Sequence, residues 1–547
     1  MPELVLGPVL RYVGETEAVI WVETDGPCEV EVLGKRERTF CVCDHHYALV
    51  CCGGLEPGSW HEYDVRLDGE QAWPVGDGFP ASAFRTYPKH DSLEVVFGSC
   101  RVAAPHVPPY SLRKDEDPRG REIDALHTLA RRMSNQPREE WPDVLLMIGD
   151  QVYADEVSPA TRAFLETRRN PSDPPGERVL DFEEYTQLYR ESWGDPTIRW
   201  LLSTISTAMI FDDHDVHDDW NISQAWLDEM REHEWWNRHI LGALASYWVY
   251  QHLGNLAPGH HEEDELLRSV KAADDGESIL ERFARRADRE TSGTRWSYCR
   301  DLGRTRLVVI DSRAGRVLEE GRRSMLDPEE WDWVANHLSG DFDHLLVATS
   351  LPWLLGPGMH YAEAWSEAVA GGAWGPALAP LAERVRQTVD MEHWAAFQES
   401  FARLAELLRS VGAGERGPAP ASIVVLSGDV HHAYLYEVAF RRGSGVESNV
   451  FQAVCSPYRN PLEKKERHSI RIGMSRPFEA FTRALARAAG VDDPEVRWRM
   501  VGDGPWFENQ VATLEIDGRR LQMRLEKAVP VDTSSARLDC VLERRLA

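Results

Sequence analysis

The sequence predicts an α+β protein with a β-rich N-terminal part and a larger, sheet-based part that contains helices. Three observations lead to this fold class. The first 88 residues hold short β-branched or aromatic runs separated by turns. Beyond them, apolar runs that each end in a polar residue recur along the chain, with helical patterns between them. The 547 residues are also too many for one ordinary core.

The N-terminal part, residues 1–88, is predicted to be a β-sandwich of the fibronectin III or immunoglobulin type. Its expected strands are residues 9–14, 17–24, 28–33 and 47–52. Leu55, Pro57, Tyr63 and Val65 then resemble the Leu-x-Pro and Tyr-x-Val pattern of fibronectin type III domains, in which a tyrosine hydroxyl ties a corner to the backbone. Residues 87–92 read as a linker, and a second domain is expected over residues 92–547.

Five apolar runs in the second part are predicted to be buried strands. They are residues 93–100, 143–150, 307–313, 344–355 and 422–432. Continuous apolar runs indicate strands that are covered on both faces. Ligands of such sheets bind at the carboxyl ends of the strands, so the functional residues are expected there.

Four other segments complete the expected fold. Residues 391–410 place Trp394, Phe397, Phe401, Leu404 and Leu408 on one face of a helix. Residues 258–292 look like a surface insertion with a helix, and residues 512–525 like a hairpin with an Asp-Gly turn. Residues 356–380, rich in Gly and Ala, are either a mobile lid or a plain loop.

Composition and charge exclude several classes of protein. The 61 basic and 90 acidic residues give a net charge of −29, which leaves no basic surface for nucleic acid and repels anionic lipid. No run approaches 18 apolar residues, so no membrane span is expected. Without a signal peptide or twin-Arg leader, we expect a cytoplasmic protein, or a mature form whose leader was removed. Four of the nine cysteines, Cys41, Cys43, Cys51 and Cys52, are expected to be small buried residues rather than zinc ligands.

The predicted strand ends carry residues that ligate metal ions. Cys100 ends the first run, Asp150 ends the second with Tyr153 and Asp155 close by, and Asp429, His431 and His432 follow the last. Between them, FDDHDVHDDW (211–220) holds Asp212, Asp213, His214 and Asp215. It lacks the Gly and Glu of an EF-hand loop. Carboxylates and imidazoles suit hard or borderline cations, while a thiolate and a phenolate favour ferric iron.

This ligand set suggests hydrolysis of phosphate esters. One Asp can bridge two ions, which together activate water and neutralise a phosphoryl group. His214 is placed to protonate a leaving oxygen. Arg101, Asp311 and Arg313 are weaker candidates, because an arginine there either clamps phosphate or forms a structural pair with an aspartate. The chain has no Gly-x-Ser-x-Gly nucleophile motif.

Together GSC, GDQxYADE, DDHDVxDDW and GDVHH resemble the PhoD-like alkaline phosphatase family, a branch of the metallophosphoesterases. The resemblance implies a catalytic domain of two mixed sheets flanked by helices, an αββα sandwich. It implies that Cys100, Asp150 and Tyr153 bind Fe³⁺, that Asp150 bridges to Ca²⁺, and that Asp429 and His431 complete the metal shell. Asp213 and His214 match the Asn and His of the wider superfamily's Gly-Asn-His-Asp/Glu motif.

Two alternatives remain, one for the ions that bind and one for the activity. Where the family usually has Asn-Asn, this chain has Asp218-Asp219, which adds negative charge and admits other divalent ions. The expected activity is metal-dependent hydrolysis of small phosphomonoesters or phosphodiesters, with Asp213, His214 and Arg101 as candidate catalytic residues. The alternative is a metal-binding protein with little or no activity that serves as a binding or adhesion module.

Overall fold

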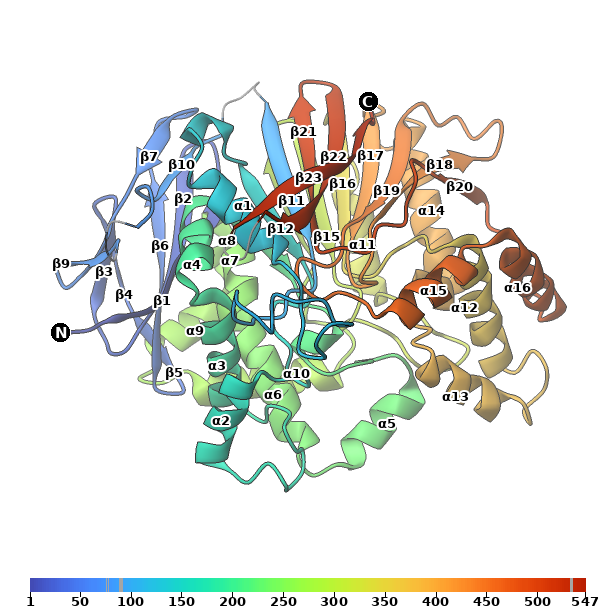
Figure 1. The fold of residues 1–547 in the computed structure, drawn as a ribbon, viewed down its shortest axis with the longest axis horizontal. Helices are drawn as coiled ribbons and strands as arrows, with labels where there is room; N and C mark the ends of the chain where they lie inside the picture. The colour runs from blue at the N-terminus through green and yellow to red at the C-terminus, as the bar shows by residue number, and fades with distance from the viewer. Residues whose placement is uncertain (75, 77, 88–91, 532–534) are drawn as a thin grey trace.

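The computed structural model describes residues 1–74, 76, 78–87, 92–531 and 535–547. Most of the predicted linker, residues 88–91, lies outside the described residues. The chain has a mixed α/β fold with several sheets and a β-rich N-terminal region (Figure 1). In the figure the N-terminal strands lie at one end, two large sheets occupy the centre, and α12 (Pro357–Ala370), α13 (Ala379–Thr388) and α16 (Arg476–Ala488) lie at the other end.

The N-terminal strands confirm the short runs predicted from the sequence. They form a sheet of order β1-β2-β6-β5, a second of order β4-β3-β8-β9, and the pair β10-β7. The strands are β1 (Leu4–Val13), β2 (Glu17–Thr24), β3 (Glu29–Val32), β4 (Lys35–Arg38), β5 (Phe40–Val42), β6 (His45–Gly53), β7 (Trp60–Glu62), β8 (Val65–Leu67), β9 (Glu70–Trp73) and β10 (Ala83–Arg85).

The N-terminal region is joined to the rest of the chain by buried hydrogen bonds. The Tyr63 hydroxyl donates to the carbonyl oxygen of Ser203 at 2.6 Å, so it ties down a distant helix rather than a corner of its own sheet. Arg11 is fully buried, and its guanidinium donates to the carbonyl oxygens of Tyr250 and Gln251. Because separating the two regions would break these buried hydrogen bonds, the regions are expected to unfold together.

Two larger sheets form the centre of the molecule. One has the order β13-β12-β11-β21-β22-β23 and the other β14-β15-β16-β17-β19-β18-β20, and each mixes parallel and antiparallel pairs. The strands are β11 (Leu93–Gly98), β12 (Val144–Ile148), β13 (Ser206–Ile210), β14 (Tyr298–Leu302), β15 (Thr305–Ile310), β16 (His344–Thr349), β17 (Ser422–Ser427), β18 (Tyr434–Phe440), β19 (Asn449–Val454), β20 (Val496–Met500), β21 (Gln510–Asp517), β22 (Arg520–Pro530) and β23 (Ala536–Arg545). All five predicted strands are present, and β21 and β22 are the predicted hairpin.

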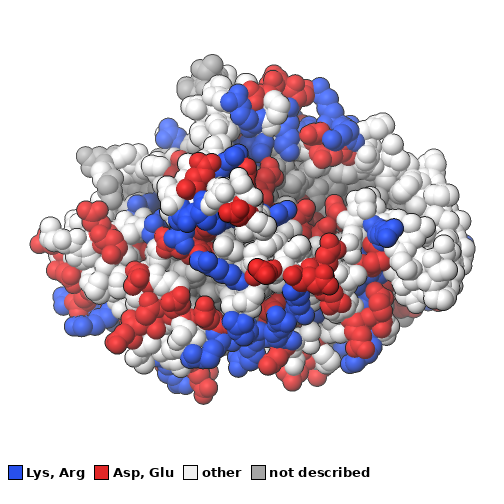
Figure 2. All heavy atoms as spheres, turned by 90° about the horizontal axis from the view of Figure 1, so that it is seen from below, with Lys and Arg blue, Asp and Glu red and all other residues white. Residues whose placement is uncertain are grey.

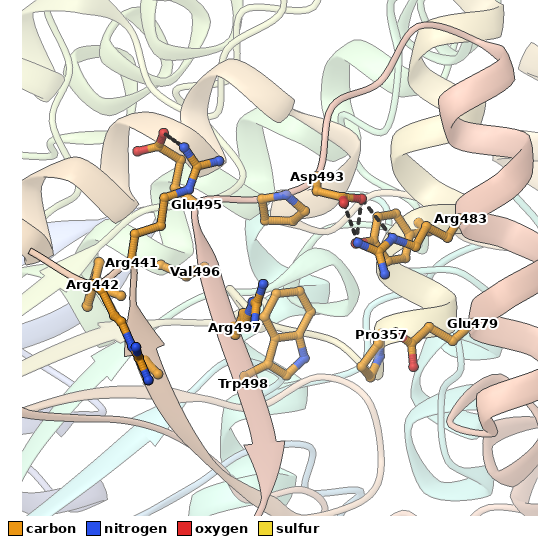
Figure 3. A pocket seen from close by; sticks show the side chains of 14 residues that line it. Pro357, Arg441, Arg442, Glu479, Arg483, Asp493, Glu495, Val496, Arg497 and Trp498 are labelled. Atoms are coloured by element: carbon orange, nitrogen blue, oxygen red, sulfur yellow. Dashed lines mark hydrogen bonds and ion pairs between the residues drawn. The ribbon is translucent and has the colours of Figure 1, made fainter. Parts of the chain in front are cut away.

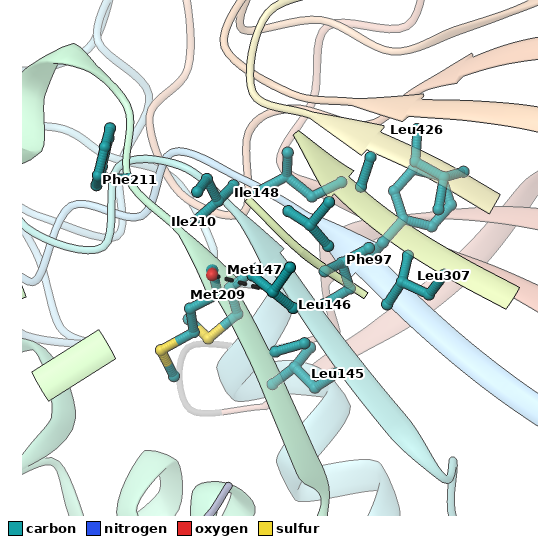
Figure 4. Packing of buried hydrophobic residues seen from close by; sticks show 14 of the residues in the cluster. Phe97, Leu145, Leu146, Met147, Ile148, Met209, Ile210, Phe211, Leu307 and Leu426 are labelled. Carbon is teal, nitrogen blue, oxygen red and sulfur yellow. Dashed lines mark hydrogen bonds between the residues drawn. The ribbon is translucent and has the colours of Figure 1, made fainter. Parts of the chain in front are cut away.

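The two large sheets share one hydrophobic core. Phe97 and Leu146 of the first sheet belong to the same buried cluster as Leu307 and Leu426 of the second (Figure 4). Every residue of β12, β13, β16 and β17 is buried. This burial explains why these strands are continuous apolar runs rather than alternating ones.

The other helices surround the sheets, and most begin at a side-chain cap such as Asp124, Asp181 or Asp195. They are α1 (Ala125–Met133), α2 (Pro159–Arg168), α3 (Phe182–Trp193), α4 (Pro196–Thr204), α5 (Gln224–Glu232), α6 (Trp236–Tyr247), α7 (Leu253–Asn255), α8 (Pro258–Glu263), α9 (Glu265–Ala272), α10 (Glu277–Arg289), α11 (Pro328–His337), α14 (Gln398–Gly412) and α15 (Lys464–Gly473). The predicted helix in the 258–292 insertion is α10.

Two predicted segments differ from the structure. Residues 356–380 are not a plain loop over most of their length, because α12 is a helix that buries His360 and Glu363; a lid role stays a prediction. The helix predicted over residues 391–410 begins only at Gln398, because the backbone at Phe397 is not helical. The predicted burial of its apolar side chains is nevertheless confirmed, since Trp394 and Phe397 are fully buried ahead of the helix.

The surface agrees with the composition. Acidic and basic side chains are interspersed on the face shown in Figure 2. Across the described residues, no helix has the length and apolar character needed to cross a membrane. Of the four clustered cysteines only Cys52 is buried; Cys51 is exposed, and Cys41 and Cys43 are intermediate, so the expectation of burial is wrong for three of them.

Candidate metal centre

The predicted strand ends converge because two glycines let them approach closely. A Cβ on Gly428, after β17, would lie 2.2 Å from the Ser99 hydroxyl oxygen and 2.7 Å from the carbonyl oxygen of Ile148. A Cβ on Gly149, whose φ is +92°, would lie 2.6 Å from Cβ of Asp212. Only glycine fits at such contacts. The Gly-Asp pairs of the sequence therefore bring β11, β12, β13 and β17 together at one edge.

The residues that follow the strands adopt a strained backbone. Cys100, Asp150, Asp429 and His431 have φ angles of +56°, +52°, +66° and +52°. Side chains other than glycine rarely occupy this left-handed region, and each such residue costs about 1–3 kcal/mol. Strain of this kind, gathered at one place, is typical of functional sites.

One group of ligand atoms consists of Cys100, Asp150 and His431, whose ligand atoms all lie within 4.8 Å of one another. The Tyr153 hydroxyl is 3.4 Å from Oδ2 of Asp150 and accepts a hydrogen bond from the Asn460 amide at 3.1 Å. Burial raises the pKa of the Cys100 thiol and of the Tyr153 phenol well above their usual ranges. A nearby cation is therefore needed before either group can ionise.

Two further groups are linked to the first, one through Asp150 and the other in turn through Asp213. Asp150, Asp213 and His214 form one, and Asp212, Asp213 and Asp429 form the other, each with ligand atoms within 4.8 Å. Among the described residues, Oδ1 of Asp150, Oδ2 of Asp212 and Oδ1 of Asp213 are buried without a hydrogen-bond partner. Buried carboxylate oxygens without partners are costly. Their convergence, with Asp150 in two groups, suits a pair of cations joined by one aspartate.

His214 is held by Asp155, which lies two positions after Tyr153 in the sequence. Its Nδ1 lies 3.0 and 3.1 Å from the two carboxylate oxygens of Asp155, and its ring packs 4.8 Å from the ring of Tyr153. Burial alone would lower the pKa of His214, but the charges of Asp155 and Asp213 raise it well above its usual value. A raised pKa favours the protonated ring, and Nε2 lies 3.8 Å from Oδ1 of the exposed Asp218.

Arg313, a weak candidate in the sequence, is the buried cation of the site. Its guanidinium bonds Asp212 and Glu392, and its Nη2 lies 3.3 Å from Oδ1 of Asp213 and 3.6 Å from Oδ1 of Asp429. Its side chain is fully buried. One fixed positive charge beside four carboxylates neutralises only part of their charge. The remainder favours added cations.

His393 and Glu363 were missed in the sequence. His393 contacts Oε1 of Glu363 through Nδ1 at 2.7 Å and Oδ2 of Asp429 through Nε2 at 3.1 Å. Although burial works against the charged form, the hydrogen bond from His393 and the charge of Arg313 hold the pKa of Asp429 well below its usual range. The signal was the run of acidic residues and His before Trp394, which resembles FDDHDVHDDW in composition.

Arg101 does not join these groups. Its guanidinium makes two contacts of 2.9 Å with Asp124, and its Nη1 donates to the carbonyl oxygen of Ser192. This is the structural pairing that the sequence left open as the alternative to phosphate binding. A catalytic role for Arg101 stays a prediction, and Arg313 is the arginine that contacts the clustered carboxylates.

A separate pocket lies away from this centre. Its volume is 830 Å³, and it is lined by residues of α12, α16, β18 and β20 (Figure 3). Two of its arginines are paired, Arg441 with Glu495 and Arg483 with Asp493. None of the clustered ligand residues lines it.

Comparison with known proteins agrees with the geometry. Residues 126–501 match a family model described as "PhoD-like phosphatase", and residues 1–84 match one described as "Domain of unknown function (DUF7800)". The solved structure described as "Structure of PhoD" aligns with 100% of this chain and 92% of its own, with 12% identity and a TM-score of 0.58. A cyclomaltodextrinase structure, with 8% identity and a TM-score of 0.18, shows no useful likeness. No curated protein matches the chain.

The fold and the family model define a phosphoesterase, and the clustered strand-end residues are its candidate metal ligands. The chain belongs to the PhoD-like phosphatase family, because the family model covers more than half of its 547 residues. Family membership thus confirms the resemblance seen in the four sequence motifs.

Proposed function

We propose that this phosphatase hydrolyses small phosphomonoesters or phosphodiesters at the strand-end centre. The observation that carries the proposal is the convergence of three buried carboxylate oxygens that lack hydrogen bonds, those of Asp150, Asp212 and Asp213. They lie beside a thiol, a phenol and imidazoles. This donor set fits two cations better than it fits a polar core, in which such oxygens would be paired.

In this proposal Cys100, Asp150, Tyr153 and His431 hold one cation, with Fe³⁺ as the ion that a thiolate and a phenolate favour. A second cation, Ca²⁺ or another divalent ion, would be held by Asp150 together with Asp213 and Asp429. When bound, the cations supply positive charge for the phosphoryl oxygens and acidify a water molecule. Arg313 orients Asp212, Asp213 and Asp429 through the contacts of its guanidinium with their carboxylates.

His214 is proposed to donate a proton to the leaving oxygen. Asp155 holds Nδ1, which leaves Nε2 to face the ester. The raised pKa of His214 keeps the proton available in alkaline solution, where a phosphatase of this family is expected to work. Asp155 thus fixes both the orientation and the charge of the acid.

We further propose that the two large mixed sheets with their helices form a metallophosphoesterase-type sandwich, and that the N-terminal sheets are an immunoglobulin-like or fibronectin-like module. The shared core of the two large sheets and the three small N-terminal sheets support this view.

The test is hydrolysis of p-nitrophenyl phosphate and bis-p-nitrophenyl phosphate before and after treatment with a chelator. We expect activity to be lost on metal removal and restored by adding ions back. Equal rates before and after verified metal removal would refute the mechanism. No turnover by metal-replete protein would instead favour an inactive metal-binding module.

The iron assignment has a separate readout. Fe³⁺ bound to a phenolate or a thiolate absorbs visible light, so the protein is expected to be coloured. Tyr153→Phe should shift or weaken this absorption, while Tyr185→Phe, which changes another buried tyrosine, should not. A colourless, iron-free, active enzyme would refute the iron assignment and leave hydrolysis standing.

A further inference from the structure

A second group of potential metal ligands lies outside the strand-end centre. His106, His127 and Asp195 place one ligand atom each within 4.8 Å of one another, and they share no residue with the other centre. They come from distant parts of the chain: the loop after Cys100, the first turn of α1 and the cap of α4. The two helices pack against each other, as Figure 1 shows.

The two oxygens of the Asp195 carboxylate have different partners. Its Oδ1 accepts hydrogen bonds from the backbone amides of Thr197 and Ile198 at 2.9 and 3.2 Å and so begins α4. Its Oδ2 faces Nε2 of His106 at 3.8 Å. Amide hydrogen bonds on one oxygen orient the other, as they do for carboxylates that bind metals.

The two imidazoles are arranged as neutral ligands rather than as cations. Their ring centroids are 3.9 Å apart with an interplanar angle of 27°, and two imidazolium ions would repel each other at this distance. Burial lowers the pKa of His106 to about 4 and also lowers that of His127. Among the described residues, neither ring takes part in a hydrogen bond. Oδ2 of Asp195 is thus left without a cation.

Residues around the site fix the loop before His106 and carry charges of both signs. Arg459 donates to the carbonyl oxygens of Ala104 and Pro105, which fixes the loop just before His106. Arg101, Arg131 and Arg459 oppose a further cation, while Asp124 and Asp195 attract it. Since these charges give no net attraction, affinity must come from coordination by nitrogen.

We propose that His106, His127 and Asp195 form a second metal site that takes a zinc-type divalent cation. Two imidazoles and one carboxylate suit Zn²⁺ and its neighbours among the transition metals, whereas Ca²⁺ and Mg²⁺ prefer oxygen alone. Bonds of about 2.0–2.2 Å would bring the ligand atoms within about 3–3.5 Å of one another. The side chains of His106 and Asp195 are 26% and 30% exposed, so they have room to close this gap.

A bound ion at this site would tie the loop that follows Cys100 to α1 and α4. The same surface position would leave one coordination position open to water. The site is therefore expected to stabilise the loop without being needed for the chemistry at the strand ends.

The experiment compares zinc binding by full-length, metal-replete protein and by variants. We expect the wild type to bind one more equivalent of zinc than His106→Ala/His127→Ala, and zinc to raise the melting temperature only where the site is intact. Asp195→Asn keeps the helix cap but weakens the ligand, so its zinc affinity at this site should fall at least tenfold. His468→Ala, which removes an exposed histidine on α15, is the matched control.

Competition with a chromophoric chelator gives the affinity, and elemental analysis gives the number of ions. Retained phosphatase activity shows that each variant is folded. Equal zinc content and affinity in the wild type, the double variant and Asp195→Asn would overturn the proposal. Loss of the additional zinc ion in His468→Ala as well would also count against it.

Discussion

His393 is predicted to position Asp429, and its removal gives a quantitative test. In His393→Ala, Asp429 loses the 3.1 Å hydrogen bond to Nε2, and Glu363 loses the 2.7 Å bond to Nδ1. A hydrogen bond to a charged group contributes about 1.5–3 kcal/mol. Lost from a ligand of the catalytic centre, this energy corresponds to a fall in kcat/KM of roughly 10- to 150-fold.

His344→Ala is the matched control. His344 is also buried and makes two bonds, at 2.8 Å with the Ser422 hydroxyl and at 2.9 Å with the Gly518 carbonyl. It lies at the start of β16, whereas the candidate centre lies where the strands end. We expect similar losses of melting temperature in both variants, but a loss of activity and of bound metal only in His393→Ala. Equal activity of the two folded variants on p-nitrophenyl phosphate would refute the positioning role.

Three other predictions concern stability and pH. Burial lowers the pKa of His45, but hydrogen bonds to Glu183 and Glu23 outweigh this effect and raise the pKa to about 9. This shift contributes about 3 kcal/mol that is fully present below pH 6.5 and lost as the pH rises through 9. The difference in melting temperature between the wild type and His45→Gln should therefore shrink from pH 6 to pH 10, and a constant difference would contradict it. Asp155→Asn removes the charge that raises the pKa of His214, so the alkaline limb of kcat should move to lower pH; an unmoved limb would exclude His214 as the acid. Gly428→Ala should abolish soluble, metal-replete enzyme, because its Cβ would meet the backbone of Ile148; normal yield and metal content would show that the strand ends can separate.

The position of the N-terminal region bears on these experiments. His45 lies on β6 and contacts Glu183 of α3 at 2.6 Å, and Arg11 of β1 is buried among carbonyl oxygens near α7. The region is thus bound to the phosphatase part through polar contacts as well as apolar ones. Removing it would leave the carbonyl oxygens of Ser203, Tyr250 and Gln251 without their donors, so we expect deletion of the region to destabilise the whole enzyme.

The strands and most of the ligand set could be predicted from the sequence. Apolar runs identify buried strands because burial on both faces excludes polar side chains. Gly-Asp at the strand ends and the Asp-His run identify Asp150, Asp213, His214, Asp429 and His431, because these residue types ligate metals. A local pattern was sufficient in each case.

The partners of those ligands were decided by tertiary structure. Arg313 was one of two arginine candidates, and nothing local distinguished it from Arg101; the contacts place Arg313 against Asp213 and Arg101 against Asp124. The pattern over residues 391–410 predicts a core helix that includes His393, because its apolar neighbours dominate the pattern. Hydrogen bonds between residues far apart in sequence leave no periodic trace, so only the folded chain shows which charged side chains meet.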